Sequence, residues 1–200
     1  SLDSDGTIAD IGALPYLNTY SGPIWYVKTD GSDLSGKGSS DEPFASVQSA
    51  INFATTSGDS VTVAQGTYVE NIDFRGRNIK VVGENAHNTI LDGSARTSVV
   101  LFNQDESSTT LLSDFTIQNG IDTNYPSGSG LSIKNADPTL RNLIVRGNTG
   151  GAGAISIHGP SQSIIQNVLV HENDTQGIFS WFSAPIIMNS TIVNNVYNGV

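Results

Sequence analysis

The 200-residue sequence contains no cysteine, and only 14% of its residues are charged. Without cysteine there is no disulfide framework, so the sequence carries no record of a redox compartment. Basic residues are scarce: nine Lys and Arg stand against 19 Asp and Glu, which gives a formal net charge of −10. This balance excludes nucleic acid as a partner, because phosphate backbones are bound by clustered Lys and Arg.

Long apolar runs are missing as well. No run approaches the roughly 20 residues that a membrane-spanning helix needs, so we expect no membrane insertion. The first ten residues, SLDSDGTIAD, have neither the basic region nor the apolar region of a secretory signal. The length allows one substantial domain or two small ones.

What the sequence does contain is a repeat. Four segments carry one ten-residue phrase: LLSDFTIQNG (111–120), TLRNLIVRGN (139–148), IIQNVLVHEN (164–173) and IIMNSTIVNN (186–195). A second phrase follows the first three copies after a polar, Gly-containing loop: GLSIKN (130–135), AISIHG (154–159) and GIFSWF (177–182). The apolar residues alternate within each phrase, and the first phrase is interrupted by one bend. This pattern predicts three short strands in each repeat.

Repeats of 22 to 28 residues with no helical pattern between the strands favour a solenoid over a sandwich of antiparallel hairpins. Equivalent residues would then stack at the strand spacing of about 4.8 Å. The fourth place of the phrase holds Asp114, Asn142, Asn167 and Asn189. We expect this column to form a structural ladder of amides at a sharp corner. The alternative is an active-site asparagine.

Residues 24–93, from IWYVKTDG to NTILDG, resemble the entry module of many secreted right-handed parallel β-helix proteins, the pectate-lyase-like superfamily. The resemblance extends from about residue 24 to residue 200. It implies an all-β fold, a right-handed parallel β-helix solenoid with a short N-terminal capping α-helix. It also implies an extracellular or cell-surface location and a polysaccharide partner, with a uronate-containing one as a specific possibility.

The expected division of the chain has three parts. Residues 1–22 form an N-terminal segment that resembles the tail of a preceding module, residues 23–60 form the cap, and residues 61–200 form the coils. Helical spacing of apolar residues in FASVQSAINFA predicts the capping helix, with Ser40 or Asp41 at its N-cap. Because VYNGV ends within an expected strand, we expect one of two arrangements: a solenoid truncated at its C-terminus, or an open last coil that makes end-to-end contact with another chain.

Alternation in the second phrase places Lys134, His158 and Trp181 in one outward column, with Phe179 in the column beside it. Aromatic rings stack on the apolar faces of sugars, and a lysine pairs with a uronate carboxylate. The resemblance implies a polysaccharide lyase that works by β-elimination. Lys134 would be the base and His158 the acid or its assistant, while Trp181 and Phe179 bind the substrate. Arg146 and His171 on a neighbouring strand would neutralise charge.

Other interpretations stay open. Lys134 and His158 can be merely solvated on a surface strand, and Trp181 and Phe182 can pack under a loop such as IDTNYPSGSG. The acidic residues of the coils fall in different columns, so neither a catalytic calcium site nor a carboxylate pair is evident. A non-catalytic structural or adhesive solenoid that docks other proteins is therefore the alternative to an enzyme.

A calcium loop is the one cofactor site that the sequence suggests, although the function as a whole requires no cofactor. The segment DSDG (3–6) partly matches a calcium-binding loop, with Asp3, Asp5 and Asp10 as the metal ligands. The last ligand place holds glycine rather than glutamate, so an ordinary Asp-Gly turn is the alternative.

Overall fold

Short strands with alternating buried residues form three parallel sheets in the computed structural model, which describes residues 18–197. The seven-stranded sheet consists of β1 (Ile24–Val27), β2 (Ser60–Val63), β5 (Lys80–Gly83), β8 (Leu111–Ser113), β12 (Thr139–Arg141), β16 (Ile164–Gln166) and β19 (Ile186–Met188). The six-stranded sheet consists of β3 (Gly66–Val69), β6 (Thr89–Asp92), β9 (Thr116–Gln118), β13 (Ile144–Arg146), β17 (Leu169–His171) and β20 (Thr191–Val193). The five-stranded sheet consists of β4 (Ile72–Asp73), β7 (Val100–Phe102), β11 (Gly128–Lys134), β15 (Gly153–His158) and β18 (Ile178–Trp181). Strands β10 (Ile121–Asp122) and β14 (Thr149–Gly150) form a small two-stranded sheet.

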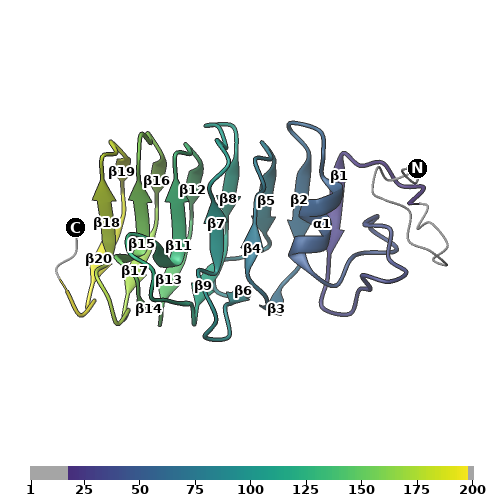
Figure 1. The fold of residues 1–200 in the computed structure, drawn as a ribbon. Helices are drawn as coiled ribbons and strands as arrows, with labels where there is room; N and C mark the ends of the chain where they lie inside the picture. The colour runs from purple at the N-terminus through teal and green to yellow at the C-terminus, as the bar shows by residue number, and fades with distance from the viewer. Residues whose placement is uncertain (1–17, 198–200) are drawn as a thin grey trace.

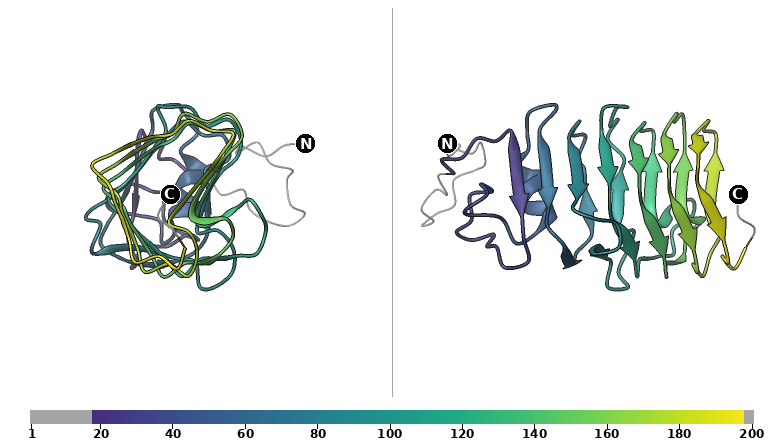
Figure 2. Two further views of the ribbon diagram at one scale, coloured as in Figure 1. Left: turned by 90° about the vertical axis from the view of Figure 1, so that its left-hand side faces the viewer. Right: turned by 180° about the vertical axis from the view of Figure 1, so that it is seen from behind.

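Successive strands along the chain belong to different sheets, so the chain winds as a solenoid (Figure 1). Leu140 pairs with Ile165 on one sheet and Val145 pairs with Val170 on the next, which is the register that the repeated phrase predicts. The view along the axis shows the coils superimposed around one closed cross-section (Figure 2). The expected right-handed parallel β-helix is confirmed.

The core fills the inside of the coils in rows of equivalent residues. Alternation places apolar residues inward, and before the last copy of the first phrase these are all buried: Leu112, Phe115, Ile117, Leu131, Ile133, Leu140, Leu143, Val145, Ile155, Ile157, Ile165, Val168, Val170 and Ile178. Ile187 and Ile192 of the last copy are partly buried. Phe74 stacks on Phe102 one coil away, with 4.3 Å between their ring centroids. Removing these side chains from water is the main favourable term for winding the chain.

The capping helix α1 (Val47–Phe53) is shorter than the sequence pattern predicts. Its N-cap is Ser46, whose Oγ accepts a hydrogen bond from the Ser49 amide, so the expected N-cap at Ser40 or Asp41 is wrong. The helix begins late because Phe44 is extended: its amide donates to the Tyr26 carbonyl and it forms a parallel bridge with Val27. The five apolar residues that carried the helical pattern are nevertheless all buried, and they are Phe44, Val47, Ala50, Ile51 and Ala54.

The cap and the coils are joined through β1. This strand lies in the segment expected to be the cap, yet it pairs in parallel with β2 and so forms the end of the seven-stranded sheet. The expected calcium ligands Asp3, Asp5 and Asp10, most of the segment 1–22 and the final residues 198–200 lie outside the described residues. Within residues 18–197, no helix is long and apolar enough to cross a membrane.

The column at the fourth place of the phrase occupies a corner of the coil. Asp114, Asn142, Asn167 and Asn189 have φ angles of 66°, 52°, 55° and 48°, which is the left-handed region that Asn and Asp tolerate best. The Asn142 side-chain amide donates to Asp114 at 3.0 Å, and that of Asn167 donates to Asn142 at 3.3 Å. These bonds form a ladder along the outside of the corner.

A second asparagine column, at the tenth place of the phrase, forms an inner ladder. Asn148 donates from its side-chain amide to Asn173 at 3.0 Å, and Asn173 donates to Asn195 at 2.8 Å. Each of the three amides also donates to a carbonyl of the preceding coil, such as that of Val145. Asn148 and Asn173 are fully buried, so these bonds satisfy polar groups that water does not reach.

Candidate functional site

The outward column expected on the second phrase lies on the five-stranded sheet. Lys134 on β11 pairs with His158 on β15, and His158 pairs with Trp181 on β18. The neighbouring column pairs Ser156 with Phe179. Parallel pairing therefore brings an amine, an imidazole and an indole, which are more than 20 residues apart in sequence, onto one face of the solenoid.

This face is partly covered by the loop between β10 and β11. Ser98 Oγ donates to the Asp122 carboxylate and is 2.7 Å from the Gly128 carbonyl oxygen, so it holds both ends of the loop. The Ser156 hydroxyl donates to the Pro126 carbonyl. As a result His158 is only 9% exposed, whereas a freely solvated column was one of the two interpretations of the sequence.

The sheet and the loop enclose a pocket of about 420 Å³, which we call the sheet pocket. Its lining consists of Thr97, Ser98, Leu101, Asn103, Asp122, Tyr125, Pro126, Ser127, Ser132, Lys134 and His158. Most of these side chains carry hydroxyl, amide or charged groups, and only Leu101 and Pro126 are wholly apolar. A polar pocket with a few convergent charged groups fits a hydrophilic ligand better than an apolar one.

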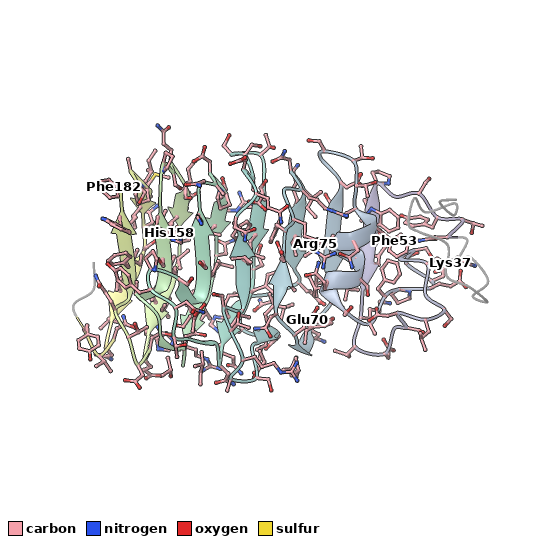
Figure 3. All side chains as sticks on the ribbon, in the orientation of Figure 1. Lys37, Phe53, Glu70, Arg75, His158 and Phe182 are labelled. Atoms are coloured by element: carbon pink, nitrogen blue, oxygen red, sulfur yellow. The ribbon has the colours of Figure 1, made fainter. Side chains whose placement is uncertain are left out.

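His158 is the most unusual side chain of the sheet pocket. Its Nδ1 atom is buried and has no hydrogen-bond partner among the described residues. Burial lowers the pKa of His158, and the positive charge of Lys134 lowers it further. The imidazole is therefore neutral at pH 7, and its buried Nδ1 is unpartnered (Figure 3 shows the place of His158 on the sheet). Such a group is better suited to accept a proton or a hydrogen bond than to act as the acid expected from the sequence.

A group of aromatic rings lies beside the sheet pocket, and one of them, Tyr125, lines it. Tyr125 from the loop lies 5.7 Å from Phe179 and 6.2 Å from Trp181 between ring centroids, and Trp181 lies 5.1 Å from Phe182. Tyr125 is 68% exposed and Trp181 45%. The loop thus touches the aromatic residues without burying them, which answers the alternative that Trp181 and Phe182 pack under it.

Arg146 and His171 do not join this site. They pair with each other on β13 and β17, which belong to the six-stranded sheet, and neither lines the sheet pocket. Arg146 donates to the Gln118 side chain, and His171 Nδ1 lies 3.3 Å from the Glu172 carboxylate. The expected neutralising role of these two residues is not supported, because a different side of the coil carries them.

The acidic and histidine side chains of the described coils do not form a cluster. Within residues 18–197, no three His, Asp or Glu side chains gather closely enough to hold a metal ion. The residues of the outer ladder bond to one another along the corner, as a structural role requires.

The solenoid architecture is that of a known protein family. Residues 77–200 match the family model described as the right handed beta helix region. The chain belongs to this right-handed β-helix family. The match covers the coils that build the sheet pocket and both ladders. A comparison with curated protein sequences finds no match.

Two solved structures have similar folds. A mutant pectin methylesterase in complex with a hexasaccharide has a TM-score of 0.54 and 14% identity, with 83% of this chain and 64% of that chain covered. A rhamnogalacturonan lyase has a TM-score of 0.53 and 16% identity, with 87% of this chain and 58% of that chain covered. This chain therefore spans roughly three fifths of the length of these proteins, and at such identities the likeness concerns the fold.

Sequence reasoning missed Asp122 and Tyr125, although the repeat contains a signal for them. The interval from Asp114 to Asn142 is 28 residues, longer than the 25 residues of the next coil. The extra length falls in the loop that contains Asp122 and Tyr125. A long loop in one coil of a solenoid is the natural place for a binding element, because the coils around it hold it rigidly.

Proposed function

We propose that this β-helix binds an acidic polysaccharide, with a uronate residue in the sheet pocket. The observation that carries this proposal is the juxtaposition of Lys134, the imidazole of His158 and the exposed rings of Tyr125 and Trp181. Lys134 supplies a positive charge for the carboxylate, and His158 accepts a hydrogen bond from a sugar hydroxyl. The rings stack on the apolar face of the adjoining sugar.

The names of the two similar structures support the class of ligand. One is a pectin methylesterase that is bound to a hexasaccharide, and the other is a rhamnogalacturonan lyase. They show that this architecture serves proteins that act on pectic polysaccharides. Because their identity to this chain is low, we infer the sugar that this chain binds from the residues of the sheet pocket and not from these names.

Tryptophan fluorescence provides a direct test, because Trp25 is buried in the cap and Trp181 is half-exposed beside the pocket. Oligogalacturonates and neutral oligosaccharides of the same length are titrated, and we expect only the former to change the emission. A Trp181→Phe variant should lose the change and a Trp25→Phe variant should keep it. Equal responses to charged and neutral oligosaccharides would contradict the proposed uronate specificity.

A second candidate function, β-elimination, is favoured by the neutral state of His158. In this reaction the imidazole removes the proton on the carbon next to the carboxylate, and the electron pair forms a carbon–carbon double bond. The bond to the glycosidic oxygen breaks, and that oxygen takes a proton from water. Lys134 would then neutralise the carboxylate, so the two residues exchange the base and helper roles assigned from the sequence.

Turnover separates the enzyme from the binding module. A lyase generates an unsaturated product that absorbs in the ultraviolet, and His158→Gln should abolish it while binding remains. Binding with no product from wild-type protein supports the non-catalytic module. Neither binding nor product across acidic and neutral glycans would favour the structural or adhesive solenoid that docks other proteins.

An extracellular or cell-surface location agrees with a polysaccharide ligand, and we propose it together with that function. The acidic, cysteine-free composition is compatible with this location. Fractionation of producing cells into cytosol, surface and medium, followed by immunodetection, tests the location. Detection in the cytosol alone would contradict it.

A further inference from the structure

Phe182 occupies a backbone position that does not suit it. It follows Trp181 and aligns with Asn135 and Gly159 in a third corner column, because the residues before them pair strand to strand. The φ angles of Asn135, Gly159 and Phe182 are 51°, 78° and 52°. Asn and Gly enter this left-handed region readily, whereas a bulky aromatic residue does so at a cost.

Burial does not compensate for this cost. The Phe182 side chain is 77% exposed, near the upper corner of one of the last coils (Figure 3). The backbone conformation of Phe182 therefore carries a cost that burial of its side chain does not offset. Residues of this kind gather at ligand sites, where a bound molecule covers them.

A second pocket lies beside the Phe182 ring at this corner. The corner pocket has a volume of about 580 Å³ and is lined by Asp137, Pro160, Ser161, Gln162, Phe182, Ser183 and Ala184. The aromatic contacts connect it to the sheet pocket. Tyr125 lines the sheet pocket and touches Trp181, and Trp181 touches Phe182, which lines the corner pocket.

The charges of the two pockets differ. The sheet pocket contains one cation, Lys134, and one carboxylate, Asp122, whose two oxygens already accept hydrogen bonds from Ser98 and Asn124. Asp137 is the only charged residue that lines the corner pocket. One oxygen of Asp137 accepts a hydrogen bond from the Gln162 amide, and the other can accept from a sugar hydroxyl. A carboxylate at this place repels a uronate but not a neutral sugar.

We propose that the corner pocket is a second subsite, which binds an uncharged sugar of the same polysaccharide whose uronate occupies the sheet pocket. This inference rests on the proposed function and extends it. The ligand would be a heteropolysaccharide that contains both acidic and neutral residues. Its chain would pass along the rings of Tyr125, Trp181 and Phe182 from one pocket to the other.

Calorimetric titration with three oligosaccharides tests this inference: a short oligogalacturonate, the same compound extended by neutral sugars, and the same compound extended by further uronates. We expect the neutral extension to raise the affinity of the wild-type protein about tenfold over the short compound. The uronate extension should add little. No gain from the neutral extension, or a larger gain from the uronate extension, overturns the second subsite while the proposed function stands.

Phe182→Asn is the decisive variant, because asparagine occupies the same corner at Asn135 and suits the backbone there. We expect an unchanged or higher melting temperature and an unchanged affinity for the short compound, with loss of the tenfold gain. Leu34→Asn removes an apolar side chain of similar exposure far from both pockets and should change neither affinity. Retention of the gain in Phe182→Asn overturns the inference.

Two further outcomes count against the subsite. If the wild-type protein forms a dimer in sedimentation experiments and Phe182→Asn makes it monomeric, the rings serve a second copy of the chain rather than a glycan. If the short oligogalacturonate itself does not bind, the proposed function fails and the subsite fails with it.

Discussion

Two regions of the molecule each carry a cationic side chain next to a histidine on the adjacent coil. Lys134 pairs with His158 on the five-stranded sheet, and Arg146 pairs with His171 on the six-stranded sheet. The first pair lies in a pocket under a loop, and its imidazole has an unpartnered nitrogen. The second pair already has partners in Gln118 and Glu172 on the surface. The register of the parallel strands produces this pairing in both regions. A loop covers only the first pair, and this cover makes it the candidate site.

Removal of the cationic side chain from each region should show the largest difference between them in ligand affinity. In Lys134→Ala, a bound uronate loses its charged partner, and we expect the affinity to fall roughly 30-fold, about 2 kcal/mol. Arg146→Ala is the matched control, with affinity within twofold of wild type. Titration with an oligogalacturonate measures both variants. Equal losses in the two would show that net charge rather than the sheet pocket attracts the ligand.

Release of the loop should make the first region resemble the second. Ser98→Ala removes the hydroxyl that contacts Asp122 and Gly128, and we expect it to lower the free energy of unfolding by about 1–2 kcal/mol. The affinity for oligogalacturonate should fall about fivefold. The rate at which His158 reacts with diethyl pyrocarbonate, followed by mass spectrometry, should rise towards that of His171. An unchanged rate would mean that Ser98 does not hold the cover in place.

The lowered pKa of His158 should make the stability of the first region depend on pH. Its pKa in the folded protein lies below the usual 6.5, so the unfolded chain takes up the proton first as the pH falls. The stability contributed by the neutral imidazole is thus complete above pH 6.5 and is lost as the pH falls from there towards the folded pKa. Thermal unfolding between pH 7.5 and pH 5 should show a smaller decline for His158→Gln than for wild type.

The same protonation has an opposite effect on the ligand. A positive imidazole beside Lys134 attracts a carboxylate, so oligogalacturonate affinity should rise about threefold between pH 7 and pH 5. Lyase turnover, if present, should fall over this range because the base is lost. Affinity that is independent of pH would place the carboxylate away from His158.

Loss of the second imidazole should have the smallest effect. His171→Gln removes only a half-exposed contact with Glu172, and exposed pairs contribute less than about 1 kcal/mol. We expect unchanged oligogalacturonate affinity and a melting temperature within about 2 °C of wild type. A clear loss of binding would show that the ligand binds to the six-stranded sheet instead.

The periodic parts of the fold could be predicted from the sequence because equivalent residues recur in every coil. The alignment of Asp114 with Asn142 and of Lys134 with His158 follows from the repeat alone. The tenth-place asparagines recur as regularly, but recurrence does not reveal which column faces inward. Their role as a buried ladder became clear only from the contacts of Asn173.

The non-periodic parts could not be predicted in the same way. The loop that contains Asp122 and Tyr125 occurs in one coil only, so no second copy indicates its path. The N-cap at Ser46 depends on Phe44, which pairs with β1 and prevents an earlier helix start. Arg146 and His171 resembled the candidate site in sequence, yet the bend before β13 turns them to another side of the coil.

The stacking of parallel strands fixes the spacing between binding groups. Lys134 and Trp181 are two coils apart, and neighbouring strands lie about 4.8 Å from each other. Insertion of one whole repeat between them would lengthen that separation by a single increment and leave each strand with a parallel neighbour on both sides. In this architecture, duplication of a short gene segment can lengthen the saccharide that fits between two binding groups, while the packing of the core stays the same in every coil.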